Sequence, residues 1–261
     1  MERIHRAFER ANSERGGALI IYVTAGDPSL EETAEIVLAA ERGGADIIEL
    51  GIPFAAPTAD GPTIQAACKR ALAADTTPPG VLETAGTIRE QSDIPLVLMT
   101  CYNPVLAYGI EEFARDAVAA GVDGALISDL PPAEAGPWVE AARTSELGTV
   151  LLVAPGNSDR QIDEAVAITT GFVYVISRPG VTGAREDIYE GLRELVNRVK
   201  ARSDVPVAVG FGLSTGEQVA EVLETADGAV VGSAVVNIIA EGNEDGTLPE
   251  RVEEKVRELR G

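Results

Sequence analysis

The chain alternates short apolar segments with amphipathic segments along nearly its whole length, and this alternation constrains the fold more than any other feature. Short apolar runs bounded by turn residues predict strands that are buried on both faces. The first, A-L-I-I-Y-V-T, ends at a turn containing Gly26 and Pro28. Seven more follow, near 46–50, 95–100, 123–128, 148–153, 172–177, 206–210 and 228–232.

The segments between these strands have the spacing of helices. One of them follows Ser29, a good N-cap residue, and ends at Gly43-Gly44. Parallel strands separated by helices need a helix-covered sheet, because each connection must return to the same end. We therefore predict an α/β fold, a single (β/α)8 TIM barrel spanning residues 1–261, with an extra N-terminal helix around Glu2 to Arg15.

A doubly wound open sheet is the alternative architecture. It usually carries G-x-G-x-x-G directly after the first strand, and T-A-G-D-P does not match that pattern. The barrel is therefore the favoured interpretation.

The charge balance excludes two classes of partner. The formal net charge is −21 and the pI is about 4.4, whereas nucleic acids and anionic membranes are bound through basic surfaces. The longest apolar runs fall well short of the roughly 18 residues of a membrane span. We expect a soluble, cytoplasmic protein.

Few residues suited to metal or nucleophilic chemistry are present. Cys68 and Cys101 lack CxxC spacing, and His5 is the only histidine. A zinc site, a disulfide framework and a Ser-His-Asp triad are all disfavoured, and we expect no metal.

Two carboxylates flank the end of the second strand. Glu49 ends an apolar run and Asp60 follows in a turn rich in Pro, Ala and Gly. In a barrel such positions reach the active-site mouth, although a strand-end acid can also form an ordinary salt bridge. Neighbours such as Ile48, Leu50 and Phe54 should raise the pKa of Glu49, whereas Asp60, on a more solvated loop, should stay ionised.

Glycine-rich turns after the last three strands indicate a phosphate site. The turns 210–214 and 232–234 each precede a helix and follow strands seven and eight, where barrels bind phosphate. The turn S-R-P-G-V-T-G at 177–183 is either a closing lid or a plain connector. The two carboxylates and the phosphate turns together predict acid/base catalysis on a phosphorylated small molecule. These residues alone do not separate an isomerase from a lyase.

The motifs together resemble a known family. E-L-G-I-P-F, A-D-G-P-T-I-Q, T-A-G-D-P, N-P at 103–104, D-L-P at 129–131, S-R-P-G-V-T-G, G-F-G-L-S and G-S-A occur in the order seen in the tryptophan synthase alpha subunit. The resemblance covers nearly the whole chain. It implies a lyase that cleaves indole-3-glycerol phosphate to indole and glyceraldehyde 3-phosphate by a retro-aldol reaction without a cofactor of its own. It also implies an α₂β₂ assembly with a pyridoxal-phosphate beta subunit that receives the indole.

The resemblance assigns roles by motif. Glu49 would protonate indole C3, and Asp60 would hold the indole N–H. The remaining substrate contacts would come from strand ends and turns: Tyr22 and Tyr174 beside the indole, Thr182 in the closing loop, and Gly183, Phe211, Gly212, Gly232 and Ser233 around the phosphate.

One position departs from the family pattern. The family usually reads P-F-S-D-P where this chain has Ala55 and Ala56 before Pro57. In the family that aspartate contacts the beta subunit, so signalling between the subunits is expected to differ here.

Two other functions stay open from the residues alone. An isomerase of a sugar phosphate or phosphoribosyl amine would use the same phosphate turns, but Cys101 is the only cysteine, histidine or lysine near a strand end. A non-catalytic barrel that binds a phosphorylated ligand would have no need of Glu49 in an apolar mouth.

Composition also predicts a salt response. Lysine occurs only three times while arginine is frequent, and the chain is strongly acidic, as in proteins of salt-loving organisms. Because salt screens self-repulsion, the melting temperature should rise strongly between low and molar KCl. Thermal unfolding at several salt concentrations measures this, and a flat profile would remove the halophilic interpretation.

Overall fold

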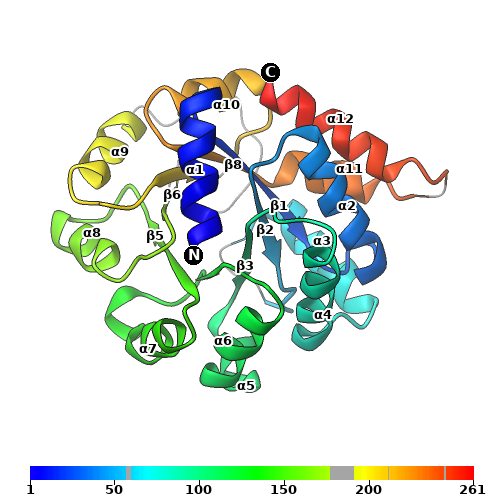
Figure 1. Cartoon of the computed structure of the whole chain (residues 1–261), viewed down its shortest axis with the longest axis horizontal. Coiled ribbons are helices and arrows are strands. Elements are labelled where there is room, and N and C mark those ends of the chain that lie inside the picture. Colours follow the sequence, from blue (N-terminus) through cyan, green and yellow to red (C-terminus); the bar gives the residue numbers. More distant parts are fainter. Residues whose placement is uncertain (57–59, 177–190, 211, 244) are drawn as a thin grey trace.

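The computed structural model describes residues 1–56, 60–176, 191–210, 212–243 and 245–261. Parallel strands pair in chain order and close into a barrel in which β8 is hydrogen-bonded to β1 (Figure 1). The strands are β1 Ala18–Thr24, β2 Ile47–Gly51, β3 Leu96–Thr100, β4 Gly124–Ile127, β5 Gly148–Val153, β6 Val173–Ile176, β7 Val207–Gly210 and β8 Gly228–Val231. The predicted barrel is confirmed.

Helices surround this barrel and cover its outer face (Figure 1). Ser29 caps α2 as predicted, since its hydroxyl accepts the Glu32 N–H at 3.2 Å. No helix within the described ranges is long and apolar enough to cross a membrane. The helices are α1 Glu2–Arg15, α2 Leu30–Gly43, α3 Pro62–Ala73, α4 Pro78–Arg89, α5 Tyr102–Tyr108, α6 Ile110–Ala119, α7 Gly136–Thr144, α8 Asp159–Val166, α9 Leu192–Lys200, α10 Gly216–Leu223, α11 Ser233–Ala240 and α12 Leu248–Arg260, with a short 3₁₀ turn, η1, at Pro132–Glu134.

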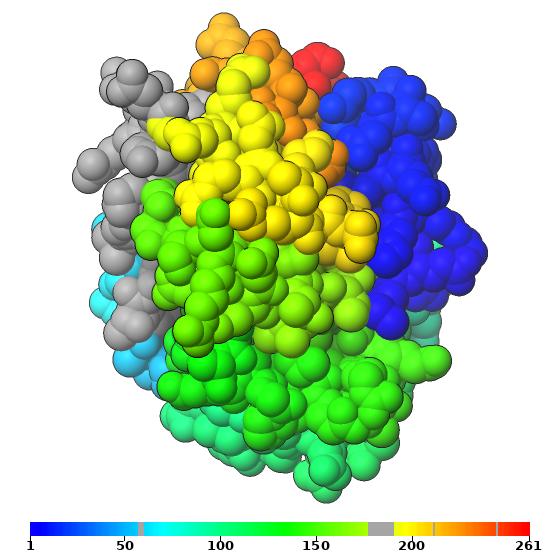
Figure 2. Space-filling model, turned by 90° about the vertical axis from the view of Figure 1, so that its left-hand side faces the viewer, coloured from blue at the N-terminus to red at the C-terminus, as the bar shows by residue number. Residues whose placement is uncertain are grey.

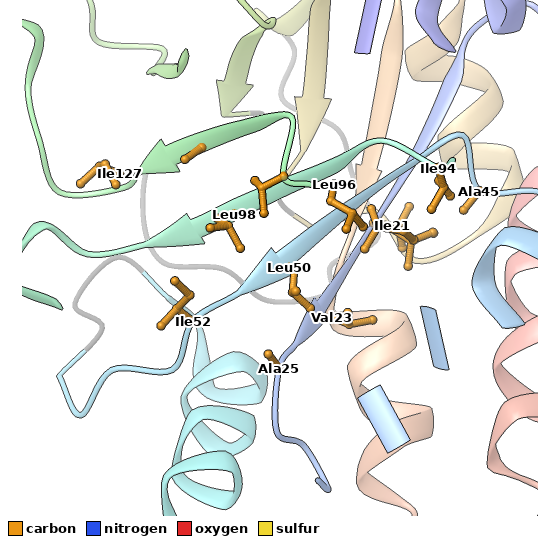
Figure 3. Packing of buried hydrophobic residues seen from close by; sticks show 14 of the residues in the cluster. Ile21, Val23, Ala25, Ala45, Leu50, Ile52, Ile94, Leu96, Leu98 and Ile127 are labelled. Atoms are coloured by element: carbon orange, nitrogen blue, oxygen red, sulfur yellow. The ribbon is translucent and has the colours of Figure 1, made fainter. Parts of the chain in front are cut away.

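Alternate strand residues point outward and form the core between strands and helices. Val23, Leu50 and Leu98, from three neighbouring strands, belong to one buried cluster (Figure 3). Trp138 of α7 joins the same cluster, with its ring 6.1 Å from that of Phe113. Apolar residues at every second strand position therefore hold the helices against the barrel wall.

Helix α1 closes the amino-terminal end of the barrel, as Figure 1 shows. Ile4 and Phe8 of this helix are buried against the barrel, and the Phe8 ring lies 5.5 Å from that of Phe172. His5 lies at this end, with Nε2 2.9 Å from the carbonyl oxygen of Thr170. The blue α1 segment occupies one edge of the molecule in Figure 2, beside the green and yellow helices α7 to α9. The pocket lined by Glu49 and Asp60 lies at the opposite end, where the strands terminate.

A buried carboxylate ties the two ends of the chain to the barrel. Asp46, just before β2, is 1% exposed and accepts the Leu19 N–H at 2.9 Å and an Arg260 guanidinium N–H at 2.6 Å. Arg15 and Arg10 lie 3.5 and 3.7 Å from its other oxygen. One acid thus joins α1, β1 and α12 at the start of β2.

Replacing Asp46 should lower the stability of the folded chain. Asp46→Ala leaves the Leu19 N–H and clustered guanidinium groups without their carboxylate, so the free energy of unfolding should fall by about 3 kcal/mol. The control is Asp93→Ala, whose carboxylate is 94% exposed and 3.6 Å from Arg3; it should cost less than about 1 kcal/mol. Denaturant unfolding measures both, and equal losses would contradict the structural role of Asp46.

Candidate active site

Strand alternation places Glu49 inside the barrel. Its Cα partner on β1 is Tyr22, and both side chains line one pocket at the carboxyl ends of the strands with Tyr174 of β6. The prediction that Ile48 and Leu50 surround Glu49 is wrong, because adjacent strand residues face opposite sides and these two lie in the outer core. The side chains that share its pocket, Tyr22 and Tyr174 among them, surround the carboxyl group instead.

Burial sets the protonation state of Glu49. The side chain is 1% exposed, and burial, with a smaller contribution from the nearby Asp60 charge, raises its pKa from 4.5 to about 8. Its Oε1 has no hydrogen-bond partner within the described part of the chain. At neutral pH the group is therefore a carboxylic acid that holds a transferable proton.

Asp60 lies just before α3 and is also buried. The expectation of a solvated loop is wrong, since Asp60 is 8% exposed. Its backbone carbonyl accepts the Gln65 side-chain amide at 2.8 Å, and Ile64 of the same helix lines the pocket beside it. Burial raises the pKa of Asp60 to about 6, so at neutral pH it is mainly ionised while Glu49 is mainly protonated.

Two glycines make room for the two tyrosines. A Cβ at Gly51 would overlap the Tyr22 hydroxyl, and a Cβ at Gly210 would overlap the Tyr174 hydroxyl. The Tyr22 hydroxyl lies 3.1 Å from Thr24 Oγ1, which gives it a hydrogen-bond partner. Both glycines belong to motifs noted in the sequence, but their role in seating the tyrosines was not predicted, although each occupies an inward-facing position at the end of its strand.

The glycine turns reach the same pocket from the other side. Gly212, Gly232 and Ser233 line it, and Ser233 begins α11, so this helix directs its N-terminus at the pocket. The prediction that each turn leads into a helix is confirmed. Helix α10 follows the first turn directly and is capped by Thr215 and Gln218, which form a capping box.

Two other strand-end acids have structural partners. Asp27 forms a bidentate pair with Arg70, with both N–O distances 2.7 Å. Asp129 accepts the Tyr102 N–H at 2.6 Å at the start of α5. These contacts hold the loops around the mouth, and neither acid lines the pocket.

Every predicted site residue that the structure describes lies in one pocket. Thr182, Gly183 and Phe211, with the turn at 177–183, lie outside the described residues. Within the described residues, no three His, Cys, Asp or Glu side chains are grouped so that they could hold a metal ion. The apolar members of the lining, Ile64, Met99 and Val230, were not predicted from the sequence.

Comparison with known proteins decides the family. The family model described as "Tryptophan synthase alpha chain" matches residues 8–260. The chain belongs to the tryptophan synthase alpha chain family. A protein of that name from Solibacter usitatus is 47% identical over 260 residues, covering 100% of this chain and 97% of that protein. One from Methanosarcina mazei is 46% identical over 259 residues, covering 99% and 93%.

Solved structures agree with this alpha chain assignment. Tryptophan synthase from Mycobacterium tuberculosis superposes with a TM-score of 0.90 at 37% identity, covering 99% of this chain and 96% of that one. A chain of the tryptophan synthase α₂β₂ complex of Pyrococcus furiosus gives a TM-score of 0.87 at 43% identity, covering 93% and 97%. The resemblance predicted from the motifs is confirmed.

The raised pKa of Glu49 predicts how stability varies with pH. Between pH 4.5 and about 8 the unfolded chain ionises Glu49 while the folded chain keeps it protonated, so this group lowers stability as pH rises. Asp60 adds a smaller decline up to about pH 6. Glu49→Gln should therefore lose less stability than the wild type between pH 5 and 8.5, as measured by denaturant unfolding. Parallel profiles would contradict the burial account.

Proposed function

We propose that Glu49 and Asp60 carry out the alpha reaction of tryptophan biosynthesis, the lyase cleavage of indole-3-glycerol phosphate that this family performs. The observation that supports these roles is the pairing of a buried, protonated carboxyl with an ionised one in a single pocket. The resulting difference in protonation lets one acid donate a proton while the other holds developing positive charge.

The first step moves a proton to the ring. Glu49 donates its proton to indole C3, which breaks the aromaticity of the five-membered ring and places positive charge on the ring nitrogen. Asp60 accepts a hydrogen bond from the indole N–H and stabilises that charge, since its carboxylate is ionised at neutral pH. The partly dry pocket strengthens this interaction.

The second step breaks the carbon–carbon bond. The Glu49 carboxylate formed in the first step takes the proton of the side-chain hydroxyl next to C3. The O–H electrons form the aldehyde C=O, the bond to C3 breaks, and its electron pair restores the indole ring. Indole and glyceraldehyde 3-phosphate leave, Glu49 is protonated again, and the steps use no cofactor.

The pocket suits the two ends of this substrate. Tyr22 and Tyr174 would lie against the indole ring, and backbone N–H groups near Gly212, Gly232 and Ser233 would hold the phosphate at the N-terminus of α11. By the family motifs, Thr182, Gly183 and Phe211 would complete the closing loop and the phosphate site. A local site of this kind matters because the chain as a whole is strongly anionic.

We further propose that the chain forms an α₂β₂ assembly with a pyridoxal-phosphate beta subunit. Support comes from the Pyrococcus furiosus neighbour, which is described as belonging to an α₂β₂ complex with mutual activation. Residues 1–261 would act as one domain, in the cytoplasm, and the acidic surface would suit a high-salt interior.

The direct test is release of indole from indole-3-glycerol phosphate by the purified chain in high salt. Wild type should release indole, and Glu49→Gln should lose essentially all turnover because it has no proton to donate. Binding of the substrate phosphate should change little, since Gln keeps the size of the side chain. Unchanged turnover in the variant would overturn the role of Glu49, and no release by the wild type, even with a beta subunit, would overturn the reaction.

Ala56 provides a test of partner signalling. It is exposed on the loop before Asp60, at the position where the family usually has an aspartate. Added beta subunit should stimulate the cleavage more strongly in Ala56→Asp than in the wild type, with Ala55→Ser as the neighbouring control. Equal stimulation in Ala56→Asp and the wild type would show that this position does not set the response.

A further inference from the structure

A second, smaller chamber opens from the active-site pocket. Its lining includes Tyr22, Asp60 and Met99, which also line the main pocket, but neither Glu49 nor the phosphate turns. The chamber therefore continues the pocket on the Asp60 side. Its remaining walls come from the start of the loop after β2, from α3, and from the ends of β3 and β4: Ile52, Phe54, Cys68, Thr100, Cys101 and Ser128.

The chamber is small and lined mainly by apolar groups and sulfur. Its free volume is about 10 Å³, about the least that one water molecule needs, so it has room for a single small substituent at most. Cys68 and Cys101 are free thiols, 4% and 7% exposed, and sulfur packs adaptably against polarizable groups. The Thr100 hydroxyl is buried without a hydrogen-bond partner within the described ranges, which leaves a donor available in this wall.

The position of the chamber selects one part of the substrate ring. In indole, C7 adjoins N1 through one ring carbon, whereas C4 lies on the C3 side. With N1 held at Asp60 and C3 at Glu49, a group on C7 projects past Asp60 and a group on C4 projects past Glu49. Only the first direction leads to the chamber.

We propose that this chamber is a specificity site that admits a single small substituent, such as chlorine, at position 7 of the indole ring. The inference rests on the proposed function, because it uses the roles of Asp60 and Glu49 to orient the ring. Cys68 and Cys101 set the depth of the chamber, since a larger side chain at either position would fill it.

The test uses the reverse reaction, condensation of glyceraldehyde 3-phosphate with indole, 7-chloroindole or 4-chloroindole. Wild type should condense 7-chloroindole with a kcat/KM within about tenfold of that for indole. Cys101→Leu should lower the ratio of 7-chloroindole to indole by about tenfold or more and leave the ratio of 4-chloroindole to indole unchanged. Cys101→Ser, which keeps the side-chain size, should retain the wild-type ratio.

A second variant tests the proposal if Cys101→Leu fails to fold. Cys68→Leu fills the chamber from α3 and should reduce the 7-chloroindole ratio in the same way. If the wild type condenses indole but not 7-chloroindole, the chamber's role is overturned and the proposed function stands. The same holds if neither leucine variant changes the ratio of 7-chloroindole to indole. Failure with indole itself would overturn the proposed function and, with it, this inference.

Discussion

Burial of one carboxyl group inside a closed barrel is the constraint on which the active site depends. Glu49 can stay protonated because the inward face of β2 is covered by Tyr22 on one side and closed across the barrel by Tyr174. The two tyrosines fit because glycines end the strands beside them. The acid chemistry therefore follows from strand register, and a shift of one residue would turn Glu49 outward into the helix-facing core.

One end of the barrel carries a buried acid that stabilises the fold, and the other carries the buried acid of the active site. At the amino-terminal end, Asp46 gathers guanidinium groups from α1 and α12 and accepts a strand N–H, so its charge is fully paired. At the carboxyl end, Glu49 lacks such pairing within the described residues and keeps its proton instead. Two carboxyl groups, equally buried, thus serve structure or catalysis according to whether cations surround them.

Much of this architecture could be predicted from the sequence because strand period and turn residues are local signals. The strands, the cap at Ser29 and the N-terminal helix all follow from spacing within a few residues. The burial of Glu49 was predicted with the wrong neighbours. Tyr22 lies beside it through the pairing of β1 with β2, and Tyr174 shares its pocket because the barrel closes. The burial of Asp60 depends on how α3 packs over the mouth, and no local pattern reports that.

The protonation state of Glu49 at neutral pH is the central claim, and difference infrared spectroscopy tests it most directly. The carboxylic acid C=O band in the wild-type spectrum minus the Glu49→Gln spectrum should persist through pH 7, fall to half its intensity near pH 8 and disappear above that, in keeping with a pKa of about 8. A band already absent at pH 6 would mean that Glu49 is ionised in the folded chain. In that case the buried acid is not the resting proton donor, and the account of the site is wrong.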